Sequence, residues 1–319
     1  MKQFLDIPFK VWVRCTTYNH SSYIVESMDG FSMQRTTFPY VCTIIDDAST
    51  DGEPEIIKDY IAQNFEQVDT VSVVVDETED YVLLFARHKE NRNCYFAVYF
   101  LKYNHYSIKK DKLSYLKDWW GVKYTALCEG DDYWIDPLKL QKQFDLLESD
   151  ATISFCHHNF YDLDLNGNKT LRTTKIPQRQ DMESIATFTA TQTLTMFYKN
   201  YQPIIPSELT GRNIYTHFFA FRLSEFGDIF YIDEPMAVYR RNPCSIYGTK
   251  DAFTKFSMAL GNIDNMIYWS KCINRFDVVK ILKRRGIKMC FNYFLHFLKR
   301  MNPKGICMSI RKAFYVYNL

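Results

Sequence analysis

Tyr124-Thr125-Ala126-Leu127-Cys128-Glu129-Gly130-Asp131-Asp132-Tyr133-Trp134 is the stretch of sequence that decides the fold. Its first part, 124–128, is an apolar run that predicts a buried strand, and three carboxylates follow it directly. Carboxylates at a strand end repel one another unless a cation lies among them. A hard divalent metal that also holds a phosphate is the usual solution, because Mg²⁺ or Mn²⁺ takes one or two protein oxygens and completes its shell with substrate phosphate.

A second acidic strand end lies upstream, at Ile44-Ile45-Asp46-Asp47-Ala48-Ser49-Thr50-Asp51. Around it, strands are predicted at 9–15, 40–45 and 71–75, with helices that begin near Ser21 or Ser22 and at Pro54. This β-α-β-α-β order favours an α/β fold with a parallel, doubly wound sheet.

Ligands of such sheets bind beyond the carboxyl ends of the strands. Three segments occupy strand ends of this kind: 16–19, Asp46-Asp47 and 129–132. We therefore expect them to converge on one nucleotide-diphosphate site.

Composition sets the broad class of the protein. The chain has 319 residues, of which 47% are apolar, enough to bury a full core. Its longest apolar run, 95–101, is too short to span a bilayer, and we expect no signal peptide, because residues 1–6 contain no apolar segment of that kind. The nine cysteines form no CxxC pair, which is typical of reduced thiols in a cytoplasmic protein.

The charge is distributed unevenly along the chain. Residues 271–319 carry twelve Lys or Arg against one acid, Asp277, for a net charge of +11. The rest of the chain holds 27 basic and 36 acidic residues, a net −9. We expect two parts, a domain at 1–249 and a helical basic tail at 250–319, with an anionic partner for the tail.

The tail mixes its basic residues with aromatic and aliphatic ones over 276–314. This pattern favours an interfacial helix on an anionic membrane leaflet. Nucleic-acid binding would give the same charge, but a wide band of large apolar groups suits lipid better. An ordinary helical cap packed on the domain is the other interpretation.

The motifs resemble those of the inverting family-two glycosyltransferases, which have the GT-A fold. The resemblance rests on 16–19, 45–51 and 128–140 and on the segment 227–240, so it covers about residues 9–245. The Glu-Gly-Asp-Asp-Tyr-Trp segment is also similar to that of enzymes that build bacterial capsular and other surface polysaccharides. Arg240 and Arg241, after the last motif, either reach the diphosphate or lie on the surface.

The resemblance implies a set of site residues. The nucleotide-binding residues would be Thr16, Tyr18, Asn19, Asp46, Asp47 and Asp131. Asp47 would contact the base, most often uracil, and the Tyr18 ring could stack on it. Asp131 would hold the ribose or share a Mn²⁺ or Mg²⁺ ion that Asp132 ligates, while Glu129 would add supporting hydrogen bonds. The alternative interpretation is structural: Asp46 and Asp47 would cap the helix that follows them, and the acids at 129–132 would form a solvated turn.

An inverting transferase needs a general base for the acceptor hydroxyl. The family's aspartate is expected at Thr216, whose hydroxyl cannot act as that base at neutral pH. His217 beside it could act as the base, because the unperturbed pKa of histidine suits that role, although a structural histidine is the other interpretation. Thr216 therefore keeps open an alternative, a catalytically silent sugar-nucleotide-binding module that docks on a membrane assembly. A nucleotidyltransferase is disfavoured, because 16–20 contains no glycine.

The sequence thus predicts a cytoplasmic, inverting hexosyltransferase, peripheral to the inner face of the cell membrane. It would move a sugar from a nucleoside-diphosphate donor, with UDP expected, to a saccharide or lipid-linked acceptor in surface polysaccharide synthesis. It would depend on a divalent cation and bind no nucleic acid.

Overall fold

The computed structural model describes residues 6–66, 73–201, 205, 207–209, 216–242 and 250–319. The chain divides into two compact units. The first comprises 1–175, 192–202 and 231–241, and the second comprises 176–191, 203–230 and 242–319. The division after residue 249 that the sequence suggests stays a prediction. Among the described residues, no helix is both long and apolar enough to cross a membrane.

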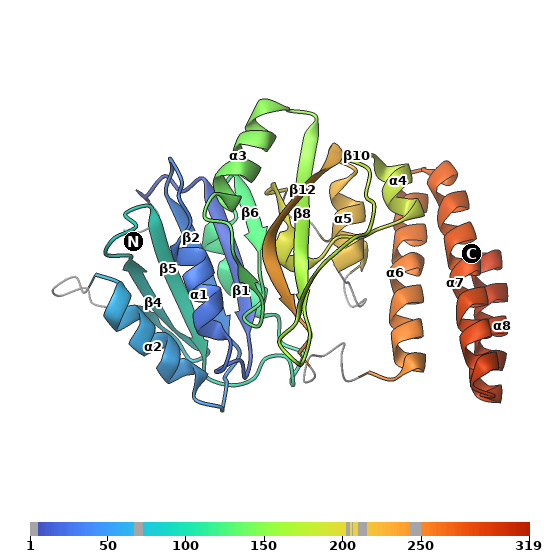
Figure 1. Cartoon of the computed structure of the whole chain (residues 1–319), viewed down its shortest axis with the longest axis horizontal. Helices are drawn as coiled ribbons and strands as arrows, with labels where there is room; N and C mark the ends of the chain where they lie inside the picture. The colour runs from blue at the N-terminus through green and yellow to red at the C-terminus, as the bar shows by residue number, and fades with distance from the viewer. Residues whose placement is uncertain (1–5, 67–72, 202–204, 206, 210–215, 243–249) are drawn as a thin grey trace. The chain divides into compact units, whose positions relative to one another are not determined.

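The first unit is built on a mixed sheet whose central strands are parallel (Figure 1). These strands lie in the order β6 (Tyr124–Leu127), β1 (Val11–Thr17), β2 (Tyr40–Asp46) and β5 (Cys94–Leu101). Every residue of β2 is buried, as expected of a central strand covered on both faces. The predicted α/β class, with a doubly wound mixed sheet, is confirmed.

Antiparallel strands extend this sheet on both sides. Beyond β5 lie β4 (Tyr81–Arg87) and β3 (Val73–Glu77), and beyond β6 lie β11 (Phe197–Lys199) and β8 (Ile153–Leu163). The strand predicted at 71–75 is present over 73–75 as part of β3, but its predicted place as the third parallel strand is wrong, because β5 takes that place. That segment begins outside the described residues and continues as the antiparallel edge strand β3. Both runs are apolar, so periodicity alone could not tell which would take the central place.

The remaining elements of the first unit connect and cover these strands. They are α1 (Ile24–Ser32), α2 (Glu53–Asn64), α3 (Lys139–Ser149), β7 (Tyr133–Trp134), β9 (Lys169–Leu171) and the 3₁₀ helices η2 (Lys112–Trp119) and η3 (Thr193–Thr195). β7 pairs with the later part of β12 (Asp228–Arg240), through Ala237 and Val238. Trp134 is buried, and its ring N–H donates to the Leu194 carbonyl at 2.9 Å, so it is a packing residue under the acidic loop.

The second unit is mainly helical. It contains β10 (Arg179–Gln180), which pairs with the first residues of β12, and α4 (Met182–Thr187), η4 (Ser207–Leu209), α5 (Thr216–Leu223), α6 (Ala252–Cys272), α7 (Phe276–Lys299) and α8 (Pro303–Asn318). Short turns join the last three helices. Asn274 and Met301, one in each turn, have left-handed backbones (φ 59° and 50°), which is how many helices end. The predicted C-terminal helical extension is present.

Candidate active site

Three chain segments meet at the carboxyl edge of the parallel strands in the first unit. β1 lies between β2 and β6, with Thr17 aligned to Asp46 across the first pair. Beyond β6, the backbone N–H of Gly130 donates to the Thr16 carbonyl at 3.2 Å. The loops that follow β1 and β6 are thus in direct contact, as the sequence led us to expect for strand ends that share one edge.

Gly130 is what lets the acidic loop approach β1 so closely. A Cβ atom at this position would lie 2.2 Å from Thr17 Oγ1 and 3.2 Å from His20 Nδ1, well inside van der Waals contact. The approach brings the His20 ring to the acidic motif, with Nε2 3.7 Å from Asp131 Oδ2. Ser27 fixes the same loop from α1, where its hydroxyl donates to the carbonyls of Gly130 (3.0 Å) and Asp132 (2.6 Å).

A buried carboxylate, Glu53, organises the loop after β1. It lies in the first turn of α2 and is fully buried. It accepts hydrogen bonds from the Thr17 hydroxyl, from the Ser49 hydroxyl at 2.8 Å and from the His20 backbone N–H at 2.9 Å. Sequence reasoning did not single out Glu53, because a glutamate at a helix start is ordinarily an exposed residue that favours the helix dipole.

Two carboxyl groups after β6, those of Glu129 and Asp132, lie where ionisation is unfavourable. Burial, then the neighbouring Asp131, raises the pKa of the half-buried Glu129 to about 7. Burial and the same neighbours also raise the pKa of Asp132. At the end of β2, burial raises the pKa of Asp46 to about 6. A cation among these groups would lower every one of these pKa values.

The donor set fits a divalent metal that is shared with a phosphate. Within the described ranges, no group of three or more His, Cys, Asp or Glu side chains is arranged as a complete metal cage. Mg²⁺ and Mn²⁺ do not need one when a substrate phosphate supplies oxygens. Of the two predicted metal ligands, Asp131 is partly exposed, at 15% of its side chain, whereas Asp132 is only 2% exposed.

Arg240, at the end of β12, holds the acidic loop in place. Its backbone N–H donates to Asp132 Oδ1 at 2.8 Å, and its Nε donates to the Asp131 carbonyl at 3.0 Å. Its guanidinium also pairs with Glu26 and lies 4.5 Å from the centre of the Tyr23 ring. The Arg240 side chain therefore links α1 to the acidic motif and holds the loop in one position.

Asp47 is enclosed by the segment that follows β5. The side chain is fully buried, and its Oδ1 accepts the His105 backbone N–H at 2.7 Å. Oδ2 accepts the Tyr106 backbone N–H at 3.2 Å and Lys112 Nζ at 2.9 Å. Both oxygens are thus engaged, so a nucleotide base could bond to Asp47 only if 105–112 moved away.

The other predicted nucleotide-binding residues lie on the loop after β1. Thr16 is half-buried, and the Tyr18 ring is 44% exposed, which leaves it able to stack on a ligand. Asn19 has a left-handed backbone (φ 55°), and its Oδ1 accepts the Thr50 N–H at 2.8 Å. This bond fastens the β1 loop to the β2 loop.

The two predicted catalytic residues belong to the second unit. Thr216 and His217 open α5 and are half-buried, while 210–215 before them lie outside the described residues. Their role as a base stays a prediction.

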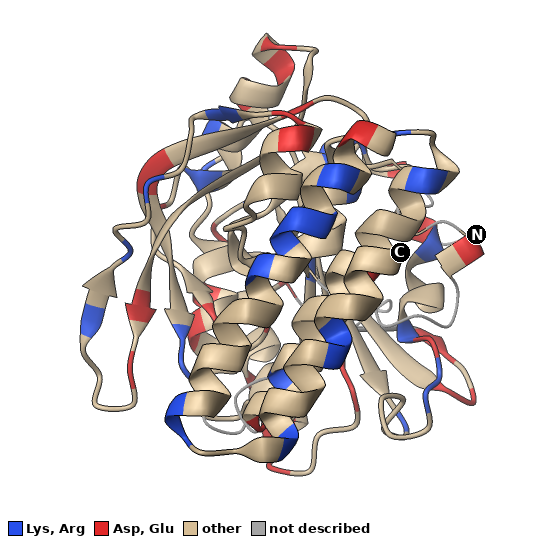
Figure 2. Cartoon of the chain, turned by 90° about the vertical axis from the view of Figure 1, so that its right-hand side faces the viewer, with Lys and Arg blue, Asp and Glu red and all other residues tan. Residues whose placement is uncertain are grey.

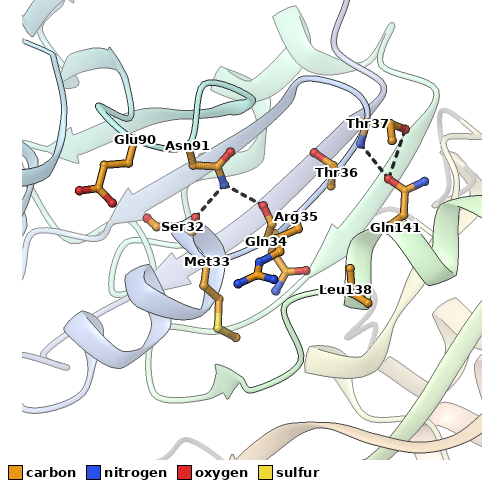
Figure 3. Close-up of a pocket in the computed structure, with 10 residues that line it drawn as sticks. All are labelled: Ser32, Met33, Gln34, Arg35, Thr36, Thr37, Glu90, Asn91, Leu138 and Gln141. Atoms are coloured by element: carbon orange, nitrogen blue, oxygen red, sulfur yellow. Dashed lines mark hydrogen bonds between the residues drawn. The ribbon is translucent and has the colours of Figure 1, made fainter.

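A cavity of about 550 Å³ lies elsewhere in the first unit (Figure 3). It is lined by residues at the end of α1, before β2 and β5, and at the start of α3: Ser32, Met33, Gln34, Arg35, Thr36, Thr37, Glu90, Asn91, Leu138 and Gln141. Its amides already serve the fold. Asn91 donates to the Ser32 and Gln34 carbonyls at 2.8 and 2.7 Å, and Gln141 accepts the Thr37 N–H at 2.8 Å. The cavity contains none of the predicted site residues.

No family model matches the chain. Uncharacterised proteins of Mycobacterium bovis and Mycobacterium tuberculosis are 33% identical to it over 236 residues, or 72% of this chain and 58% of theirs. The chain thus spans little more than half the length of these relatives.

Two solved structures have a similar arrangement. Staphylococcus aureus TarS 1–349 in complex with UDP-GlcNAc has a TM-score of 0.49 at 13% identity, covering 94% of this chain and 90% of that one. The mannosyltransferase PcManGT from Pyrobaculum calidifontis, in complex with GDP-Man and Mn²⁺, has a TM-score of 0.48 at 13% identity, covering 97% and 75%. Because both scores lie below 0.5, we base the fold on the strand order itself, and the function on the carboxyl-edge site.

Proposed function

We propose that this protein is a glycosyltransferase that takes its sugar from a nucleoside-diphosphate donor with the help of Mn²⁺ or Mg²⁺. One observation carries the proposal. Glu129, Asp131 and Asp132 crowd the carboxyl end of β6, against the loop that follows β1, and burial together with neighbouring acids raises the pKa of both Glu129 and Asp132. A cation-bound diphosphate would neutralise the charge of the carboxyl groups. It would also lie beyond the carboxyl ends of the strands, where sheets of this kind bind their ligands.

The residues divide the work as follows. Asp131 and Asp132 would hold the metal, with Glu129 adding supporting hydrogen bonds, while the Arg240 N–H keeps Asp132 in place. When bound, the metal would offset the charge that develops on the departing nucleoside diphosphate. Tyr18 would stack on the base, with uracil expected.

Further parts of the proposal rest on the family resemblance. Thr16, Asn19 and Asp46 would line the ribose and base pocket, and transfer would invert the anomeric centre. His217 would take the proton of the acceptor hydroxyl. The acceptor would be a saccharide or a lipid-linked sugar, in the synthesis of a surface polysaccharide.

Calorimetric titration of the full chain with UDP, GDP and dTDP tests the proposal, each with and without Mn²⁺. We expect one of them to bind only when Mn²⁺ is present. Asp131→Asn should weaken that binding at least about tenfold, the usual effect of damaging a metal site. Asp145→Asn, an exposed carboxylate on α3, is the matched control and should bind as the wild type does. Absence of Mn²⁺-dependent binding to all three would overturn the proposal.

Turnover separates the enzyme from a silent binding module, the alternative that Thr216 raises. Donor hydrolysis or transfer that His217→Ala abolishes, with nucleotide binding intact, would support the enzyme. Nucleotide binding by the wild type without any turnover of the cognate donor would favour the module.

A further inference from the structure

The outer face of the last two helices of the second unit has an unusual composition. α7 and α8 pack closely on each other and on α6 through a core of Phe256, Leu260, Cys290, Phe297 and Val316. Gly305 allows part of this contact, since a Cβ there would lie 2.3 Å from the Phe297 ring. The core fixes how each helix is rotated, so it also fixes which side chains point outward.

Large apolar side chains form a stripe along each outward face. On α7 these are Ile287, Phe291, Leu295 and Leu298, which are 37%, 58%, 38% and 50% exposed. On α8 they are Ile310, Phe314 and Tyr317, which are 44%, 65% and 70% exposed. Spacings of three and four residues place each set on one side of its helix. Exposed apolar area of this extent typically marks an interaction surface.

The same two helices are strongly basic. Residues 276–319 hold ten Lys or Arg and one acid, Asp277. Figure 2 shows basic residues along both helices and in the turn between them. Some of these cations have structural partners. Arg285, for instance, donates to the Ile185 and Ala186 carbonyls at 3.1 Å.

Three cations without carboxylate partners surround a groove on α8. The groove has a volume of about 510 Å³ and is lined by Pro303, Lys304, Cys307, Met308, Arg311 and Lys312. No carboxylate lines it. Within the described part of the chain, neither lysine nor Arg311 forms an ion pair with an acid. An anion with an apolar neighbour is the complementary ligand.

We propose that this face of α7 and α8 docks on an anionic membrane leaflet. The apolar stripes would enter the interfacial region, while Lys304, Arg311 and Lys312 would bind the phosphate of an anionic lipid headgroup. A wide apolar band that includes Ile and Leu side chains, beside cations without carboxylate partners, favours lipid over a nucleic acid, whose binding surfaces combine cations with polar and stacking groups. This inference does not rest on the glycosyltransferase proposal.

Co-sedimentation of the full chain with vesicles tests the inference. The wild type should sediment with vesicles of phosphatidylcholine and phosphatidylglycerol and stay in solution with phosphatidylcholine alone. The triple variant Lys304→Glu, Arg311→Glu, Lys312→Glu should partition at least about tenfold less, given the attraction that each cation near a charged leaflet contributes. Its matched control reverses three exposed lysines elsewhere, Lys109, Lys117 and Lys175, by the same amount.

A second variant tests the apolar stripes. Phe291→Ser with Phe314→Ser should also release the protein from the anionic vesicles, while thermal unfolding followed by circular dichroism stays near that of the wild type, since both rings are largely exposed. The inference is overturned if the wild type does not bind anionic vesicles. It is also overturned if the lysine control loses binding as fully as the triple variant does. A dimer in analytical ultracentrifugation that the two Phe substitutions abolish, without any vesicle binding, would instead assign the face to self-association.

Discussion

Replacing Glu129 with Gln removes a carboxyl group whose pKa rises, mainly through burial, from 4.5 to about 7. Such a group holds its proton more tightly in the folded chain than in the unfolded one. Below pH 4.5 it is neutral in both states and costs nothing, and above about pH 7 it is ionised in both, so the folded state bears the full cost. The free energy of unfolding of the metal-free wild type should therefore fall, relative to that of Glu129→Gln, between these two pH values.

The size of this effect follows from the pKa difference. Each pH unit corresponds to about 1.4 kcal/mol, which sets a ceiling of roughly 3 kcal/mol. Because Glu129 is half-buried, solvent screens part of that cost, and we expect a relative loss of about 1–3 kcal/mol. Urea unfolding in chelator-treated buffer, at several pH values across the window, measures it. Glu79→Gln, an exposed site, is the control. If the free energies of unfolding of the wild type and of Glu129→Gln change with pH in the same way, the pKa of Glu129 is not raised by folding.

Metal and nucleotide should relieve the same strain. Above pH 7, Mn²⁺ with the nucleotide that binds should stabilise the wild type by about 2.7 kcal/mol at a ligand concentration one hundred times Kd. Glu129→Gln should gain less, because it has one fewer charge to neutralise. If Mn²⁺ and the nucleotide do not change the free energy of unfolding of the wild type, the raised pKa of Glu129 is unrelated to metal binding.

Two further substitutions test how the site is built. Gly130→Ala places a Cβ against Thr17 and should lower the free energy of unfolding by about 1–3 kcal/mol. The control Gly121→Ala, with no atom within 4 Å of its Cβ, should change it by no more than about 1 kcal/mol. Equal stability of the two variants in urea would count against close packing at Gly130. Asp47→Asn weakens an acceptor that serves two backbone N–H groups and Lys112, so we expect a loss of about 1–3 kcal/mol; an unchanged urea midpoint would mean that this enclosure adds nothing to stability.

The sequence located the parts of the site that are local along the chain. Strands predicted at 9–15 and 40–45 correspond to β1 and β2, and the acidic stretch follows β6 as expected. Such segments are recognisable because an apolar run and its polar end are adjacent in sequence. The order of neighbouring strands then follows from the preference for parallel pairing in β-α-β units.

The long-range contacts could not be predicted in the same way. Arg240 bonds to Asp132 across more than one hundred residues, and Lys112 reaches Asp47 across 65. Neither pair has a periodic signature, since each depends on how loops fold after the sheet has formed. The resemblance assigned Asp47 to a ligand, whereas the structure shows its oxygens bonded within the protein. Sequence patterns indicate which residue types gather at a strand end. They do not indicate which of these side chains already have hydrogen-bond partners within the protein.

Two groups of charged residues in the described part of the chain are physically informative. Burial and neighbouring acids raise the pKa of Glu129 and Asp132 after β6, even though Arg240 is bonded to the same loop. The cations around the α8 groove have no acidic partner within the described residues, although an Asp or Glu one turn away would neutralise one of them. Each arrangement lowers the stability of the isolated protein, and internal pairing would have removed that cost. A chain folded for stability alone would not keep both, so the balancing charges are best sought outside it: a divalent cation with a diphosphate at the first, and a lipid phosphate at the second.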